Sequence, residues 1–421
     1  MTEKLLHFIW RLQYFNKESL SLDSGESLQV IFAGNHNYHQ GPDFLQAKIK
    51  IDKTVLAGNI ELHVLSSDWK KHAHDSDKNY QNIILHVVWD DDQPHIATKM
   101  PTLSLNRRVS KLLLNRYQLL MDNAAFVPCE KMFDQVNDII WHSWKQRLTI
   151  ERMQRKSETV MRYFSESNNH WEETFWWLLA KNFGAKVNEE VFEAMARSIS
   201  VNILAKHKNQ IHQLEAMLLG QCGLLEKDFQ EDYPLMLQKE YQFLKHKYQL
   251  KELNMHAHLL RMRPGNFPTI RLAQLAMLIS QSIHLFAQLK EALSVDDAKK
   301  ILSVTANDYW SYHYVPDEPS SFKRKLIGKQ MLENILINTI VPMLFAYGFF
   351  HKEQCHEQKA IKWLEEMSAE KNNIIGQWLK SGAKCKSAFD SQALIELKTR
   401  YCDKKRCLEC AIGNTLMKGS L

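Results

Sequence analysis

A chain of 421 residues, 45% of them hydrophobic, is long enough for two or three domains with packed cores. Its formal net charge of +6 is small, so composition alone is weak evidence for a nucleic-acid partner, which usually presents a stripe of Lys and Arg. The N-terminus lacks the basic-then-apolar pattern of a secretion signal. The most apolar segment, 331–350, is interrupted by Glu333 and Pro342, which favours a buried helix over a membrane span. We therefore expect a globular cytoplasmic protein without a membrane partner, and the sequence does not indicate its oligomeric state.

The first hundred residues predict a domain that mixes helices with strands. Residues 3–15 place apolar side chains at helical spacing, whereas residues 43–51 alternate apolar and charged side chains, which is the period of a half-buried strand. The returning segment 55–65 places Glu61 and His63 on one face and apolar side chains on the other. The expected order is one helix, three strands, a short helix and a strand, over residues 3–15, 28–32, 43–51, 55–65, 67–71 and 82–89.

The candidate site combines Asp43, which opens the second strand, with Glu61 and His63 in the third. The motifs Pro42-Asp43 and Glu61-Leu62-His63 resemble those of the PD-(D/E)XK nuclease superfamily, in which an Asp opens one strand and an acidic-x-Lys triplet follows on the next. The resemblance implies a restriction-endonuclease-like αβββαβ core in which Asp43 and Glu61 hold Mg²⁺ or Mn²⁺ beside a phosphodiester, since hard cations bind carboxylate oxygens and polarise water. His63 stands where the superfamily has Lys, so a variant nuclease, a zinc site and an inactive relative are all open.

Two other interpretations of these residues are open. In the first, Asp43 is a turn residue after Gly-Pro, and Glu61 is a solvent-facing carboxylate of a strand. In the second, His72 and His74 join Glu61 and His63 around a tetrahedral zinc ion with one open position, which would make the protein a zinc-dependent hydrolase.

Residues 104–380 predict a large all-α domain. Long runs with a period of 3.6 residues indicate helices over residues 105–121, 136–165, 170–183, 188–198, 203–219, 233–248, 268–293, 325–349 and 355–368. Four short segments of the chain resemble those of an uncharacterised bacterial family of unknown function: 58–63, 67–69, 219–225 and 263–271. That resemblance covers nearly the whole chain and implies no activity.

One loop in the helical region brings Arg261, Arg263 and Arg271 together with two prolines. Prolines stiffen a loop, and Pro268 is suited to open the next helix, so we expect guanidinium groups held ready for phosphate or carboxylate. An alternative interpretation with the same weight is a structural role, in which these arginines bind the carbonyls of helix ends or pair with acidic side chains.

The C-terminal tail, residues 381–421, contains Cys385, Cys402, Cys407 and Cys410. An odd total of seven cysteines without an export signal favours reduced thiols or a metal site over a disulfide framework. The C-x4-C-x2-C run, with a fourth cysteine upstream, has the character of a metal knuckle, because a C-x2-C pair can chelate one ion. The spacing fits no standard zinc ribbon, so zinc, an iron–sulfur cluster and unligated buried cysteines are all open.

These observations predict an α+β protein with a restriction-endonuclease-like domain (1–103), a large helical domain (104–380) and a cysteine-bearing tail (381–421). The expected function is metal-dependent hydrolysis of phosphodiester bonds in nucleic acid, DNA ahead of RNA, with Lys70 and Lys71 beside the site as phosphate contacts. The competing class is a non-catalytic nucleic-acid or protein interaction module that keeps a degenerate nuclease fold.

Overall fold

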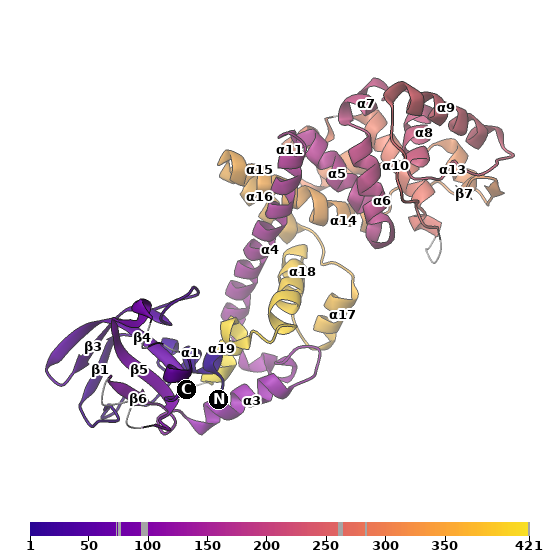
Figure 1. Ribbon diagram of the computed structural model, residues 1–421. Coiled ribbons are helices and arrows are strands. Elements are labelled where there is room, and N and C mark those ends of the chain that lie inside the picture. The colour runs from indigo at the N-terminus through magenta and orange to yellow at the C-terminus, as the bar shows by residue number, and fades with distance from the viewer. Residues whose placement is uncertain (73, 75–76, 94–99, 260–263, 283, 420–421) are drawn as a thin grey trace. The chain divides into compact units, whose positions relative to one another are not determined.

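The chain forms two compact units in a computed structural model (Figure 1). The first unit comprises Met1–Trp141 and Lys398–Leu421, and the second comprises His142–Leu397. The described residues are 1–72, 74, 77–93, 100–259, 264–282 and 284–419. This division differs from the expected boundaries after residues 103 and 380, because residues 104–141 belong to the first unit and the end of the chain returns to it.

A mixed β-sheet forms the core of the first unit (Figure 1). Its strands are β1 (Leu28–Phe32), β2 (Asn35–His36), β3 (Phe44–Ile51), β4 (Thr54–Leu65), β5 (Ile83–Asp90) and β6 (Thr102–Ser104). They lie in the order β1, β3, β4, β5, β6, with the short β2 beside β3. Pairing is antiparallel from β1 to β3 to β4 and parallel from β4 to β5 to β6. The long strands therefore match the predicted segments, and the structure adds β2 and β6.

Burial differs between the two central strands. In β3, Ala47 and Ile49 are buried and Lys48 is exposed, as the alternating pattern predicts. In β4, both faces are covered, since Glu61 is only 5% exposed and His63 only 1% exposed. The interpretation of Glu61 as a solvent-facing carboxylate is therefore wrong.

Helix α1 (Glu3–Leu12) packs on β4 and begins and ends as its sequence suggests. The side chain of Thr2 accepts a hydrogen bond from the backbone N–H of Leu5 and caps the first turn. Gln13 ends the helix in the left-handed conformation, with φ of 55°. The indole N–H of Trp10 donates to the carbonyl oxygen of Ala33 over 3.0 Å, which fixes the helix against the sheet.

The end of the chain completes the first unit. Its remaining elements are α2 (Asp68–Lys71), η2 (Lys78–Tyr80), α3 (Lys111–Asp122), η3 (Glu130–Gln135), η7 (Cys407–Glu409) and α19 (Ala411–Lys418). Helix α19 packs on α3 and on η7. The hydroxyl group of Tyr14 donates to Asn414 Oδ1 over 3.4 Å, and the guanidinium of Arg116 donates to the carbonyl oxygen of Met417 over 3.5 Å.

The second unit is almost entirely helical. Its helices are α4 (Asp138–Glu166, which starts in the first unit), α5 (Trp171–Phe183), α6 (Ala185–Ser198), α7 (Val201–Lys206), α8 (Ile211–Gln221), α9 (Asp232–Tyr248), η4 (Pro264–Asn266), α10 (Pro268–Gln281), α11 (Leu285–Glu291), α12 (Val295–Leu302), α13 (Asp308–Tyr312), α14 (Lys329–Ile335), α15 (Val341–His351), α16 (Gln354–Glu366), α17 (Asn373–Lys380) and α18 (Ala388–Glu396). The π-helical segments η5 (Leu336–Ile340) and η6 (Leu397–Cys402) follow α14 and α18, and β7 (His313–Val315) pairs with β8 (Glu318–Pro319).

Helices of the second unit differ from the predicted ones mainly where they break. The predicted helices 203–219 and 268–293 each divide in two, because the chain turns between α7 and α8 and because Ser282 is extended after α10, with φ of −158°. The structure also adds four short helices that periodicity did not indicate. Each begins after a side chain that accepts a hydrogen bond from a backbone N–H of the first turn: Ser294, Asn307, Asn372 and Ser387.

The most apolar helical run, Lys329–His351, is long and apolar enough to cross a membrane by composition alone. Within its most apolar window, 72% of the residues are buried inside the fold. Side chains such as Ile337, Met343 and Leu344 belong to the core of the second unit, as predicted for a buried helix.

Candidate metal site

Two carboxylates meet where β3 begins beside β4. Asp43 immediately precedes β3, and Glu61 lies in β4 next to Ile60, which pairs with Phe44 across the strands. The backbone N–H of Asp43 donates to Glu61 Oε2 over 3.1 Å. In return, the backbone N–H of Leu62 donates to Asp43 Oδ2 over 2.9 Å. Each carboxylate is therefore held by the strand that carries the other one, and the expected pairing of Asp43 with Glu61 is present.

Helix α1 adds a histidine that the sequence did not single out. His7 Nε2 lies 3.3 Å from Asp43 Oδ2. Although this nitrogen is buried, it has no hydrogen-bond partner among the described residues, so it approaches the carboxylate without the alignment of a hydrogen bond. His36 of β2 lies behind it, with its Nε2 3.4 Å from His7 Nδ1. A carboxylate and an imidazole this close can form an ion pair when the imidazole is protonated, and both are side chains that can bind a metal.

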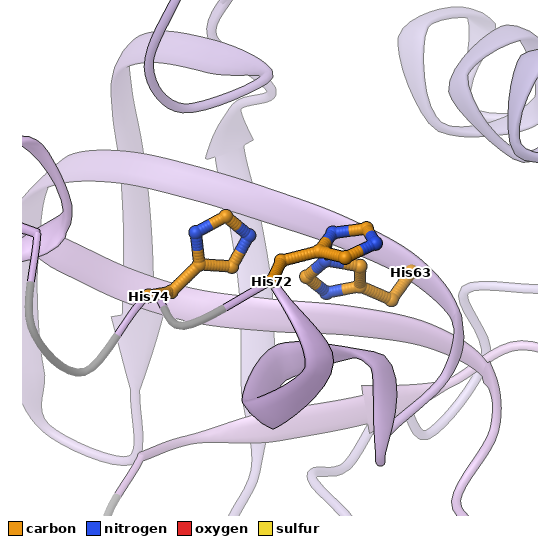
Figure 2. Close-up of side chains that lie close together, drawn as sticks. All are labelled: His63, His72 and His74. Atoms are coloured by element: carbon orange, nitrogen blue, oxygen red, sulfur yellow. Dashed lines mark hydrogen bonds between the residues drawn. The ribbon is translucent and has the colours of Figure 1, made fainter.

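Three further histidines gather on the other side of Glu61. Figure 2 shows the rings of His63, from β4, and of His72 and His74, from the segment after α2, close together. One ring nitrogen of each lies within 4.8 Å of the others. His63 Nε2 lies 3.2 Å from His72 Nδ1, and His74 Nε2 lies 3.4 Å from Glu61 Oε1. Glu61, His63, His72 and His74, the four residues of the zinc interpretation, therefore lie close together.

Aromatic rings and a fourth histidine orient this cluster. His86, in the parallel strand β5, is fully buried, and its Nε2 lies 2.9 Å from His63 Nδ1. That contact leaves His63 Nε2 directed at His72 and Glu61. The ring of Tyr80 stacks on His74 with centroids 3.8 Å apart.

Burial decides the charges of these groups. Burial raises the pKa of Glu61 to about 9, and the neighbouring charge of Asp43 adds to the shift. Burial also lowers the pKa of His63 to about 3 and that of His86 to about 4. At neutral pH and without a cation, Glu61 is therefore protonated and both imidazoles are neutral. Neutral imidazoles are the form that binds metals, and Glu61 becomes a ligand when a cation displaces its proton.

The donor set fits a divalent transition metal. Carboxylates alone suit Mg²⁺, whereas imidazole nitrogens favour Mn²⁺, Fe²⁺ or Zn²⁺. Asp43, Glu61, His7 and His74 supply both kinds of donor within a largely buried site. His63 and His72 extend the same group of donors.

The basic residues expected to bind phosphate have different environments. Lys70 and Lys71 are exposed on α2, where Lys71 Nζ also lies 2.6 Å from Asp68 Oδ1. Arg261 and Arg263 lie outside the described residues.

Arg271 lies in α10 and is 9% exposed. Its guanidinium donates to Gln274 Oε1 over 3.0 Å and to Asn266 Oδ1 over 2.6 Å. These contacts, with burial, favour the structural alternative for Arg271.

The predicted set of four cysteines is divided between the two units. Cys385 belongs to the second unit, where Asp390 and Lys145 are among its charged neighbours. The other three belong to the first unit, where Cys129 lies near them. Cys129 follows the predicted helix 105–121, and no spacing rule connects it to a motif at the other end of the chain.

The fold and the site define an α+β protein with an N-terminal mixed sheet, a large helical unit and a cluster of carboxylates and histidines, which are residue types that can bind a divalent metal. Residues 3–373 match the family described as Protein of unknown function (DUF2851), and the chain belongs to this family. This match confirms the resemblance to an uncharacterised family. No curated protein and no solved structure matches the chain.

Proposed function

We propose that the first unit is a metal-dependent hydrolase that cleaves phosphodiester bonds in nucleic acid. The observation that carries the proposal is the reciprocal backbone pairing of Asp43 and Glu61 at the junction of β3 and β4. The sheet supports it, because an antiparallel β1, β3, β4 set continues into a parallel β5 after α2, in the αβββαβ order that the nuclease resemblance implies.

Asp43 and Glu61 would hold the cation, and His7 and His74 lie where they can complete its shell. A bound divalent cation supplies Lewis-acid polarisation of a water molecule and neutralises charge on a phosphate. The imidazoles shift the expected metal from Mg²⁺ toward Mn²⁺ or Zn²⁺. Lys70, exposed on α2, is available to the phosphate backbone of the substrate.

His63 acts as a neutral orienting group in this proposal and is not one of the metal ligands. A general base works best when its pKa lies near the working pH, whereas burial lowers the pKa of His63 to about 3. His63 is therefore poorly suited to accept a proton from the attacking water. His86 positions the ring through its contact with His63 Nδ1, so that Nε2 stays directed at the site.

Substitution of Glu61 tests the proposal. Cleavage of single- and double-stranded DNA and RNA should be measured with Mg²⁺, Mn²⁺ and Zn²⁺ in separate reactions. We expect Glu61→Gln and Asp43→Asn to abolish cleavage, since loss of the metal removes its whole contribution and loss of even one acid-base group costs about 10²- to 10⁴-fold. Glu18→Gln, which changes an exposed carboxylate of the same unit, is the matched control and should cleave like the wild type.

Absence of cleavage by the wild type with all three metals, together with absence of metal binding at Asp43 and Glu61, would refute the proposal. That result would leave the non-catalytic interaction module. Cleavage that persists at the wild-type rate in Glu61→Gln would also refute it, because the carboxylate pair would then have no role.

The histidine cluster favours a second candidate, a zinc-dependent hydrolase. Its ligands would be His63, His72 and His74 with Glu61, which the structure brings together. His63→Lys separates the two candidates. A nuclease that uses the carboxylate pair should keep or gain activity with the Lys of the resembled superfamily, whereas a zinc site that uses His63 as a ligand should lose its metal.

A further inference from the structure

We propose that Cys129, Cys402, Cys407 and Cys410 form a four-thiolate metal centre, with zinc or an iron–sulfur cluster as its occupant. This centre is separate from the carboxylate and histidine site and does not depend on the proposed function. It differs from the set expected from the sequence, because Cys129 takes the place of Cys385.

Two distant parts of the chain lie side by side at this place. Cys129 immediately precedes η3, whereas Cys402 ends η6, Cys407 opens η7 and Cys410 immediately precedes α19. All four belong to the first unit.

Two lysines mark the contact between the segments. Lys405 Nζ donates to the carbonyl oxygen of Met121 at the end of α3. Lys398 Nζ lies 4.9 Å above the ring of Phe126. The segment 398–410 is therefore anchored along the residues that lead to Cys129.

The turn that carries Cys407 and Cys410 has the compact form of a chelating knuckle. The backbone N–H of Cys410 donates to the carbonyl oxygen of Cys407 over 3.3 Å, and the N–H of Asn414 donates to the carbonyl oxygen of Cys410 over 2.8 Å. Gly413 lets α19 approach this turn, since a Cβ at that position would lie 2.3 Å from the carbonyl oxygen of Cys407. Two thiols two residues apart on such a turn can bind one ion together.

Three of the four thiols are buried, Cys402 is half-buried, and electrostatic interactions connect them. Cys129, Cys407 and Cys410 are 7–8% exposed. Burial raises the pKa of Cys129 and of Cys402 well above the ordinary range, and Cys407 and Cys410 add to the rise in both. A bound zinc or iron ion overcomes this rise in pKa, because a thiol that coordinates such an ion loses its proton outright.

Two lysines supply positive charge near these thiols. Lys398 opposes the rise in the pKa of Cys402, and Lys405 opposes it for Cys407. Cys385 has a different environment, since its neighbours are Asp390, Lys145 and Glu370 rather than other cysteines. Four sulfur ligands suit tetrahedral zinc and also suit an iron–sulfur cluster. Among the described residues these cysteines do not form a group with ligand atoms within 4.8 Å of one another, which favours the cluster, because its cysteines bind separate irons and lie farther apart than those around one zinc ion.

The test compares Cys129→Ser with Cys385→Ser in the full-length chain. Protein should be produced anaerobically with zinc and iron both supplied, and zinc, iron and acid-labile sulfide measured per chain. We expect the wild type and Cys385→Ser to hold about one more zinc ion, or one more cluster, per chain than Cys129→Ser. Any zinc at the carboxylate and histidine site is common to all three proteins and does not affect this difference. Zinc without sulfide identifies the single ion, whereas iron with sulfide and broad visible absorbance identifies the cluster.

A second measurement keeps the test valid if Cys129→Ser fails to fold. X-ray absorption at the metal edge of the wild-type protein should show a first shell of sulfur, at about 2.3 Å for zinc, whereas a metal held only by the histidine site would show nitrogen and oxygen at about 2.0–2.2 Å. The proposal is overturned if the wild type contains neither metal, if the shell contains no sulfur, or if Cys385→Ser loses the metal while Cys129→Ser keeps it. Cleavage of nucleic acid is measured separately, so failure of either proposal leaves the other one intact.

Discussion

Binding of a cation at the carboxylate pair should release close to one proton per metal ion at pH 8. Burial raises the pKa of Glu61 to about 9, so about nine-tenths of the Glu61 side chains carry a proton at pH 8 in the metal-free protein. The cation displaces that proton when the carboxylate becomes a ligand. His63 releases none, since burial lowers its pKa to about 3 and the ring is already neutral. An ordinary imidazole, with a pKa of about 6.5, is also neutral at pH 8.

Isothermal titration calorimetry measures this proton count directly. Mn²⁺ should be titrated into the protein at pH 8 in two buffers that differ in ionisation enthalpy, because the difference between the observed heats gives the number of protons released. Mn²⁺ is chosen because it prefers oxygen and nitrogen donors and so avoids the cysteine centre. We expect about 0.9 proton per bound ion at pH 8 and a fall toward zero as the pH rises past about 10.

The matched controls separate Glu61 from other sources of protons. Glu18→Gln should release as many protons as the wild type, whereas any Mn²⁺ that Glu61→Gln still binds should release almost none. Binding of Mn²⁺ to the wild type at pH 8 without proton release would refute the reasoning. Glu61 would then be ionised before the metal arrives, and its burial would not have the electrostatic effect described above.

Two further predictions concern the second unit. Glu215 is fully buried, and burial raises its pKa to about 7 from the ordinary 4.5, so the stability it contributes is complete below about pH 4.5 and is lost as the pH rises through about 7. The unfolding free energy of the wild type should therefore fall between pH 5 and pH 8, and Glu215→Gln should reduce this fall by up to about 3 kcal/mol, as measured by urea titrations. The same fall in the variant and the wild type would contradict this prediction. Arg271→Ala should lower the unfolding free energy by about 1–3 kcal/mol, because it removes the donors to Gln274 and Asn266. A change in the salt dependence of DNA binding without loss of stability would instead make Arg271 a phosphate contact.

The sequence by itself determined the elements whose signals are local. The alternation of side chains over residues 43–51 and 55–65 predicted β3 and β4, and the short connection between them predicted that Asp43 and Glu61 would meet. Helical periodicity likewise predicted most long helices of the second unit. These features follow from periods of 2 and 3.6 residues, which any short window of sequence contains.

Only the tertiary structure decided the other members of both candidate sites. His7 reaches Asp43 because α1 packs on β4, and Cys129 joins Cys402 because the end of the chain returns to the first unit. The burial that raises the pKa of Glu61 also comes from this packing, since the alternating pattern of β4 predicted an exposed face. Contacts between residues far apart in the sequence leave no fixed spacing, and desolvation depends on every element that covers a side chain. Neither these long-range contacts nor the desolvation of a side chain can be calculated from a local pattern of residues.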